Sequence, residues 1–320
     1  MMNVLSAFGI NTNADLTQIS SGIINSTWKV KSATSYYILQ RINDHVFVSP
    51  ENIHQNISAV SAYLNKYHPE YLFPAPILSL GGSELVHIPG EGYYRLFPFI
   101  AGTHTINVVE DAKQAFEAAE QFGRFTAYLG GFDVGQLKVT IPYFHDLLYR
   151  HQQFLDAINT GNAERVYAQQ ALIQRLAKFE FLVKQFEDIS RNADFKKRVT
   201  HHDTKISNVL FNAANKAVCV IDLDTLMPGY FFSDVGDMMR TYLCPVSENE
   251  ADTNKIIIRP SFYHAIVQGY SQEMREELTN AEKEHFFYAG QFMIYMQAIR
   301  FLTDYFNNDK YYQILYSNHN

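Results

Sequence analysis

Short runs of apolar and aromatic residues, separated by polar turns, mark the first hundred residues, and this pattern predicts strands. Four runs are rich in aromatic and β-branched side chains: residues 28–30, 36–42, 84–87 and 93–97. One helix is expected among them, with Ser49 as its N-cap and Pro50 at its first position. Apolar residues then recur on one helical face: Ile53, Ile57, Val60 and Leu64. The amino-terminal part is therefore predicted to be a small β-rich unit with one helix.

The pattern changes to helical spacing after a connector at residues 98–102. Long helices are expected at residues 112–129, 163–189 and 281–306. The first of them is predicted to end at the Gly130-Gly131 pair. A strand–loop–strand segment at residues 198–223 interrupts the helices. The whole pattern predicts an α+β fold with a small β-rich lobe, a hinge and a larger, mainly helical lobe.

Composition excludes several classes of protein. Of the 320 residues, 47% are hydrophobic, and the formal net charge is −7. A net negative chain lacks the broad basic face that nucleic acids require, so no nucleic-acid partner is expected. The sequence shows neither a signal peptide nor a run long enough to span a membrane, so a cytoplasmic protein without membrane partners is expected.

The two cysteines, Cys219 and Cys244, form no CxxC pair, which argues against structural zinc and dithiol chemistry. Cys219 lies within an apolar run and is expected to be reduced and buried.

The most informative segment combines carboxylates and an amide at a fixed spacing. Asp203 follows a His-x step, Asn208 comes five residues later, and Asp222 ends the next apolar strand. Phosphoryl transfer requires such groups: a carboxylate that accepts a hydroxyl proton, oxygen ligands for Mg²⁺ and a cation near the transferred group. The protein-kinase template assigns Asp203 as catalytic base and Asn208 and Asp222 as metal ligands. Lys205 would neutralise charge on the γ-phosphate.

Simpler interpretations of these residues exist. Asp203, Asn208 and Asp222 could each be ordinary turn, cap or strand-end residues. His201 or His202 could bind a transition metal, but no further ligand follows at a suitable interval, and His201 is expected to brace the loop.

At this segment the chain resembles the aminoglycoside phosphotransferase and choline kinase superfamily, and within it most of all the N-acetylhexosamine 1-kinase family. The resemblance rests on residues 200–205 with Asn208, residues 221–229, 37–43, 144–146 and 300–305, and it covers nearly the whole chain. It implies a protein-kinase-like fold with a nucleotide-binding lobe at residues 1–97, a hinge at 98–102 and a catalytic and substrate-binding lobe at 103–320.

The resemblance also implies an activity. ATP and Mg²⁺ would phosphorylate the anomeric hydroxyl of N-acetylglucosamine or N-acetylgalactosamine. Asp203 would contact the sugar hydroxyl, and the sugar would be held by Arg300, Asp224 and either Tyr311 or Tyr312. For Arg300, a helix-surface ion pair with Asp304 is the simpler alternative.

The nucleotide contacts depart from the kinase pattern. The loop at residues 20–27 has one glycine, Gly22, and could cover phosphates with Asn25 or be a plain turn. No strand lysine is evident, and Gln40 or Arg41 occupies its region on opposite faces of the strand. The helix after Pro50 has no acid beyond Glu51 to pair with such a lysine. Adenine is expected near Phe97 and Phe99.

Other choices stay open. Asp234 and Asp237 are interpreted as helix-start and loop-bracing residues, and Phe144, His145 and Asp146 as either sugar-pocket or packing residues. The acceptor could be another small alcohol such as choline, an aminoglycoside or homoserine; choline would favour an aromatic cage and an aminoglycoside an acidic pocket. A non-catalytic kinase-fold binding protein is the alternative from a different class. The oligomeric state is not predicted.

Overall fold

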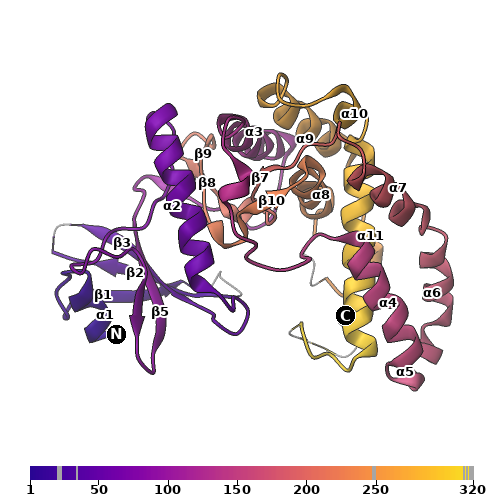
Figure 1. The fold of residues 1–320 in the computed structure, drawn as a ribbon, viewed down its shortest axis with the longest axis horizontal. Helices are drawn as coiled ribbons and strands as arrows, with labels where there is room; N and C mark the ends of the chain where they lie inside the picture. Colours follow the sequence, from indigo (N-terminus) through magenta and orange to yellow (C-terminus); the bar gives the residue numbers. More distant parts are fainter. Residues whose placement is uncertain (20–23, 34, 247–249, 313, 315, 317–320) are drawn as a thin grey trace.

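The computed structural model describes residues 1–19, 24–33, 35–246, 250–312, 314 and 316, and it confirms the α+β class. Figure 1 shows a small sheet-containing lobe on the left and a larger, mainly helical lobe on the right. The small lobe contains a five-stranded antiparallel sheet in the order β1-β2-β3-β5-β4. Its strands are β1 (Asp15–Ile19), β2 (Ser26–Lys31), β3 (Tyr36–Ile42), β4 (Val86–Ile88) and β5 (Gly92–Pro98). The short helix α1 (Met2–Ala7) lies beside them.

Strand alternation gives this sheet two different faces. Val30, Leu39 and Leu96 lie on one face and form a small apolar cluster with residues of α1. Gln40 and Arg95 are directly paired across β3 and β5, and they lie on the other face. The second face is the one that meets the large lobe, because Arg95 forms an ion pair with Asp224.

Helix α2 (Pro50–Tyr67) connects the lobes. It begins as predicted, with Ser49 as N-cap and Pro50 in the first turn. Its four predicted apolar positions are all buried, and they join the core of the large lobe: Ile53, Ile57, Val60 and Leu64. Asn56 fixes the helix further by donating to the carbonyl oxygens of Lys138 and Leu226 at 2.8 and 2.7 Å. Helix α2 belongs to the expected lobe of residues 1–97 but packs in the core of the large lobe, so the two lobes do not separate cleanly at residue 97. The expected lobe limits therefore stay a proposal.

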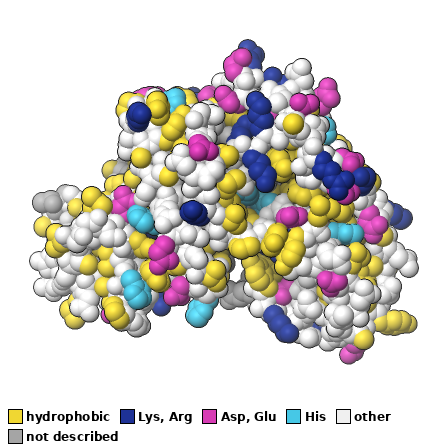
Figure 2. Space-filling view, in the orientation of Figure 1, with side chains coloured by type: hydrophobic (Ala, Val, Ile, Leu, Met, Phe, Trp, Pro, Cys, Tyr) yellow, Lys and Arg dark blue, Asp and Glu magenta, His cyan; other side chains and the backbone are white. Residues whose placement is uncertain are grey.

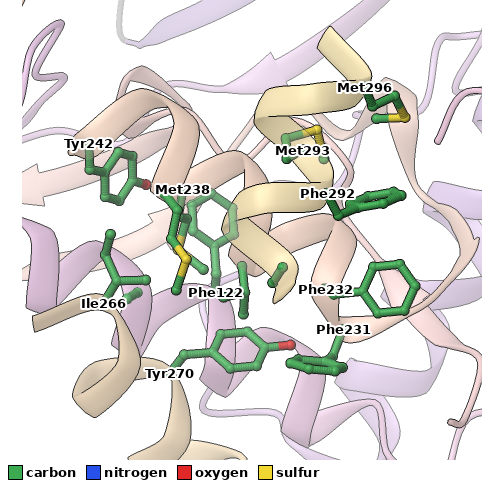
Figure 3. Packing of buried hydrophobic residues seen from close by; sticks show 14 of the residues in the cluster. Phe122, Phe231, Phe232, Met238, Tyr242, Ile266, Tyr270, Phe292, Met293 and Met296 are labelled. Carbon is green, nitrogen blue, oxygen red and sulfur yellow. The ribbon is translucent and has the colours of Figure 1, made fainter. Parts of the chain in front are cut away.

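The large lobe is built around four helices, α3 (Ala112–Tyr128), α8 (Phe231–Tyr242), α9 (Pro260–Glu273) and α11 (Phe286–Phe306). Figure 3 shows the aromatic and methionine side chains of its core. The labelled residues are Phe122, Phe231, Phe232, Met238, Tyr242, Ile266, Tyr270, Phe292, Met293 and Met296. The other helices are α4 (Leu147–Thr160), α5 (Ala163–Ala168), α6 (Gln170–Ala177), α7 (Phe181–Ser190) and α10 (Asn280–Lys283).

Short strands between the lobes flank the segments that carry Asp203, Asn208 and Asp222. They are β6 (Thr103–His104), β7 (Arg198–Thr200), β8 (Val209–Asn212), β9 (Ala217–Val220) and β10 (Met227–Gly229). β7 pairs with β10, and β8 lies between β6 and β9. Single 3₁₀ turns are η1 (Val134–Gln136), η2 (Ile206–Asn208), η3 (Leu223–Thr225) and η4 (Thr253–Lys255). Cys219 lies in β9 as a buried free thiol, as expected.

The prediction of one helix over residues 163–189 was wrong, because three helices, α5 to α7, occupy that range. The buried residues Val166, Leu176 and Phe186 explain the breaks. In a continuous helix of 100° per residue, Val166 and Phe186 would point roughly 160° apart, so one straight helix could not bury both on one face. The 281–306 helix is likewise divided, between α10 and α11.

The first long helix also ends differently from the prediction. α3 stops at Tyr128, and Gly130 does not adopt the left-handed conformation of a glycine C-cap. In the part of the chain that the structure describes, no helix combines the length and apolar character needed to cross a membrane.

Candidate active site

The loop between β7 and β8 brings three predicted residues together. Asn208 Nδ2 donates to Asp203 Oδ2 at 3.0 Å and to the Asp203 carbonyl oxygen at 2.8 Å. Lys205 Nζ lies 3.2 Å from the same Oδ2. The Asp203 carboxylate is half-buried, so it is held in place while remaining accessible to a ligand.

Asp222 follows β9 in a left-handed conformation, with φ 62° and ψ 62°. The residue before it is joined to the loop that carries Asp203, because Ile221 donates its N–H to the Asn208 carbonyl oxygen at 2.9 Å. Asp222 is exposed. Protein packed around its carboxyl group nevertheless raises its pKa to about 7, and the charges of Asp224 and Asp203 add to this effect. A bound cation would lower the electrostatic repulsion among the carboxylates of Asp203, Asp222 and Asp224.

Helix α8 braces the loop from behind. Asp234, in its first turn, accepts the N–H groups of His201 and His202 at 3.0 and 2.7 Å. Asp237 accepts the N–H of Thr204 at 2.7 Å. Both acids brace the loop, as predicted, but only Asp234 lies at the start of α8; Asp237 lies further along the helix. His201 is also a brace, since its Nε2 lies 2.9 Å from the Ile221 carbonyl oxygen.

His202 gives the loop a dependence on pH. Its ring is buried, with Nδ1 at 3.2 Å from the carbonyl oxygens of both Thr200 and Thr225, so Nδ1 carries a proton and donates. Burial lowers its pKa to about 4. An unfolded chain therefore binds the proton first, near its ordinary pKa of about 6.5. The stability that neutral His202 contributes is present above this value and is lost as the pH falls towards 4.

We expect His202→Gln to remove this dependence. Relative to the variant, the wild type should lose on the order of 3 kcal/mol of unfolding free energy between about pH 6.5 and pH 4. The difference between the two proteins should be constant above about pH 7. Urea unfolding of both proteins across this range measures it, and parallel pH profiles would contradict the assignment of a buried neutral ring.

A buried cation on β5 was missed from the sequence. Arg95 is 3% exposed, and its Nε and Nη2 donate to Gln40 Oε1 at 3.1 and 2.9 Å. It forms a close ion pair with Asp224, which is 2% exposed. Asn25 Nδ2 donates to the other oxygen of Asp224 at 2.6 Å. The remaining nitrogen, Arg95 Nη1, is buried and has no hydrogen-bond partner among the described residues.

β3 has Gln40, not a lysine, at the expected position. Its directly paired partner on β5 is Arg95, which carries a positive charge. A signal was present in the sequence, because Arg95 is a single charged residue within an aromatic and apolar strand. Asp224, expected in the sugar site, is instead engaged by Arg95 and Asn25 of the small lobe.

The other residues that were expected to contact the nucleotide do not lie together. Arg41 lies on the opposite face of β3, against Gly92, and is not part of this cluster. Phe97 lies under Arg95, whose guanidinium carbon is 5.1 Å from the ring centre. Phe99 lies under Lys29 at 4.1 Å, and its N–H already contacts the Tyr36 carbonyl at 3.3 Å. Gly22 lies outside the described residues.

Of the expected sugar residues, Arg300, Tyr311 and Tyr312 line a separate cavity of about 360 Å³ on the large lobe, whereas Asp203 and Asp224 do not. Arg300 and Tyr312 both line it, and both hydrogen-bond to Gln297, at 3.1 and 3.3 Å. The alternative ion pair of Arg300 with Asp304 is not formed; Asp304 accepts the backbone N–H groups of residues 310–312 instead. Arg300 also lies 5.2 Å from the ring centre of Phe144.

Phe144 and His145 lie between this cavity and the loop that carries Asp203. Their rings lie 6.3 and 5.2 Å from that of His202, next to Asp203. Burial lowers the pKa of His145 well below its ordinary value, and the charges of His202 and Arg300 contribute. Asp146 instead caps α4, accepting the N–H of Tyr149 at 3.0 Å.

The described residues contain no cluster of three or more His, Cys, Asp or Glu side chains that could hold a metal by themselves. A metal in this site would therefore depend on the Asn208 amide oxygen and on ligand oxygens as well as on carboxylates. On the face seen in Figure 2, basic and acidic side chains are interspersed rather than gathered into a broad basic surface.

Comparison with known proteins agrees with this geometry. The model of the phosphotransferase enzyme family (APH) matches residues 15–279. The solved structure of a microcompartment-associated aminopropanol kinase is 17% identical with a TM-score of 0.62, and the match covers 96% of this chain and 97% of that one. An amicoumacin kinase is 16% identical with a TM-score of 0.65, and the match covers 99% of this chain and 87% of that one. A spectinomycin phosphotransferase is 16% identical with a TM-score of 0.57, and the match covers 98% of this chain and 94% of that one. At such identities the likeness of structure shows a shared fold. Because the family model covers most of the 320 residues, the chain belongs to the phosphotransferase enzyme family.

Proposed function

We propose that this phosphotransferase is an ATP- and Mg²⁺-dependent kinase that phosphorylates the anomeric hydroxyl of an N-acetylhexosamine. The observation that carries the kinase part is the convergence of Asn208 and Lys205 on the Asp203 carboxylate, at 3.0 and 3.2 Å. The family match supports the class of reaction. The resemblance to N-acetylhexosamine 1-kinases and the lining of the cavity support the acceptor.

In this proposal Asp203 accepts the proton of the acceptor hydroxyl while that oxygen forms its bond to the γ-phosphorus. The bond from the γ-phosphorus to the β,γ-bridging oxygen breaks, and the leaving ADP takes that electron pair. Lys205 lies beside Asp203 and stabilises negative charge on the transferred group. Asn208 holds the Asp203 side chain in the orientation that receives the proton.

The residues present fit magnesium bound with a nucleotide. Mg²⁺ takes oxygen ligands and is usually held by one or two carboxylates together with phosphates. The Asp222 carboxylate and the Asn208 amide oxygen would supply such ligands. Burial raises the pKa of Asp222, the neighbouring carboxylates of Asp224 and Asp203 raise it further, and a bound cation would offset both effects. When bound, the metal would neutralise charge on the phosphates.

Arg95 is the proposed small-lobe contact to the nucleotide phosphates. Its Nη1 is buried without a partner among the described residues, and an arginine fork suits phosphate oxygens. The solved amicoumacin kinase contains the ATP analogue AMP-PNP, and a spectinomycin phosphotransferase contains ADP, which supports a nucleotide in this cleft. The adenine would lie beside Phe97 and Phe99.

The cavity chemistry favours an acceptor without an amine. Arg150, Arg300 and Lys310 line it, whereas an aminoglycoside would require an acidic lining. Arg300 offers donors to sugar hydroxyls and to an acetamido carbonyl, and Tyr312 offers a hydroxyl and an apolar face.

A panel of acceptors with labelled ATP tests the function. We expect transfer to N-acetylglucosamine or N-acetylgalactosamine, with an acid-labile sugar 1-phosphate as product. Transfer to choline, homoserine or an aminoglycoside, with none to N-acetylhexosamines, would replace the sugar assignment by another alcohol. Absence of turnover with any acceptor, together with absence of Mg²⁺-dependent ATP binding, would favour a non-catalytic binding protein.

A further inference from the structure

The cavity beside Arg300 carries an excess of positive charge. Its lining includes three cationic side chains and a single carboxylate. The cations are Arg150, Arg300 and Lys310, and the carboxylate is Asp304. Asp304 is buried and accepts the backbone N–H groups of Lys310, Tyr311 and Tyr312 at 2.8–2.9 Å, so its charge is largely used in holding the segment after α11.

Neither arginine forms an ion pair with a carboxylate of the described residues. Arg150 donates to the amide oxygen of Gln153 at 2.9 Å, and Arg300 donates to that of Gln297 at 3.1 Å. Other half-buried or buried arginines of this lobe do have acidic partners: Arg198 pairs with Glu282, and Arg165 with Asp309. Arg259 is another half-buried arginine without an acidic partner, and backbone carbonyl oxygens accept from it. Arg150 and Arg300 differ from it in lying together in one cavity, where no carboxylate of the described residues pairs with either charge.

The two guanidinium groups also act on each other. Burial lowers the pKa of Arg150, and the charge of Arg300 is the next cause. Both remain charged, because an arginine pKa stays far above neutral pH. Two neighbouring cations with free donor capacity match the oxygens of a carboxylate or a phosphate, which accept paired hydrogen bonds from such forks. An anion in this cavity would gain hydrogen bonds and remove a like-charge repulsion.

The position of the cavity limits which part of a ligand can enter it. Asp203, Asn208 and Asp222 do not line it. Phe144 lies between, with its ring 5.2 Å from the Arg300 guanidinium and 6.3 Å from the His202 ring. Its volume of about 360 Å³ is within the range of small-molecule sites. The cavity would therefore receive a part of the acceptor that is remote from the hydroxyl at Asp203.

We propose that the acceptor carries an anionic group, a carboxylate or a phosphate, which binds between Arg150 and Arg300 while the reacting hydroxyl lies at Asp203. This inference rests on the proposed function in placing the reaction at Asp203 and the acceptor against Arg300. It narrows the substrate class from neutral N-acetylhexosamines to acidic derivatives of them.

Kinetics with matched acceptors test the inference. The neutral probe is N-acetylglucosamine, and the anionic probes carry a phosphate or a carboxylate at C3, C4 or C6 with the anomeric hydroxyl free. Glycerate, a hydroxy acid without a sugar ring, is the third probe. We expect kcat/KM for at least one anionic sugar to exceed that of the neutral sugar by about tenfold or more. The phosphate and carboxylate series then distinguish the two sources of charge.

The variant Arg150→Gln separates charge recognition from catalysis. It should raise KM for the preferred anionic acceptor by about tenfold or more, with a clearly smaller rise in KM for the neutral sugar and a smaller change in kcat than in KM. Arg191→Gln is the matched control, since Arg191 is an exposed arginine paired with Glu187 on α7. Thermal unfolding of both variants verifies that they fold.

Each outcome decides a different statement. Equal kcat/KM for neutral and anionic sugars, or an Arg150→Gln variant that affects both alike, would overturn the anionic acceptor and leave the sugar kinase intact. Turnover of glycerate but of no sugar would support the anionic acceptor and reject the N-acetylhexosamine. Turnover of amine-bearing alcohols alone would reject both.

Discussion

Asp203→Asn should lower kcat by about 10²–10⁴-fold, while the KM for ATP changes by less than about threefold. The amide cannot accept the hydroxyl proton, but it has nearly the same shape and can still contact Asn208. The ion pair lost with Lys205 is partly exposed, so the loss of stability should be at most about 1 kcal/mol. Initial rates with saturating acceptor, together with thermal unfolding, measure both effects.

Asp146→Asn is a suitable control for this substitution. Asp146 is another aspartate near the acceptor cavity, but it caps α4 and is assigned no chemistry. It should lose a few tenths to about 1 kcal/mol of stability with little change in kcat. If Asp203→Asn retained more than a tenth of the wild-type kcat, Asp203 could not be the catalytic base.

Arg95→Gln should have the largest effect on stability, because it leaves the Asp224 carboxylate buried without its cation. Breaking a buried ion pair from one side costs about 3–5 kcal/mol. The same change should weaken ATP binding if Arg95 contacts the phosphates. Denaturant unfolding and the KM for ATP report these two consequences separately.

Two double variants distinguish a structural from a nucleotide-binding role. In Arg95→Gln with Asp224→Asn neither buried charge remains, so stability should largely return. A KM for ATP that stays raised in this variant would support a phosphate contact, and a KM that returns to the wild-type value would reject it. In Arg95→Gln with Gln40→Lys the cation moves to the directly paired position on β3, and we expect both stability and ATP binding to recover in part.

The arrangement of the loop that carries Asp203 could be predicted because its residues are close together in the sequence. Asp203, Lys205 and Asn208 lie within six residues, so their spacing alone indicates that they can meet. The strand that delivers Asp222 was recognised from its apolar run. The bracing role of Asp234 and Asp237 was also predicted, although the position of Asp237 in the interior of α8 was not.

The small-lobe cation could not be predicted in the same way. Its identity depends on which residue of β5 lies opposite Gln40, and β3 and β5 are separated by α2 and β4. Strand register over such a distance is set by packing and turn geometry rather than by local spacing. The same limitation applies to α5–α7, where helical periodicity continued through two breaks that only the packing of Val166, Leu176 and Phe186 explains.

The anchoring of α2 has a consequence for motion. Its apolar face and Asn56 hold α2 to the large lobe. The sheet has its own small apolar cluster, on the face that carries Val30, Leu39 and Leu96. If the sheet moved relative to the large lobe, α2 would stay with the loop that carries Asp203, because its buried contacts are made to the large lobe. Such a movement would have to break the Arg95–Asp224 contact, because this is a direct ion pair between the sheet and the large lobe.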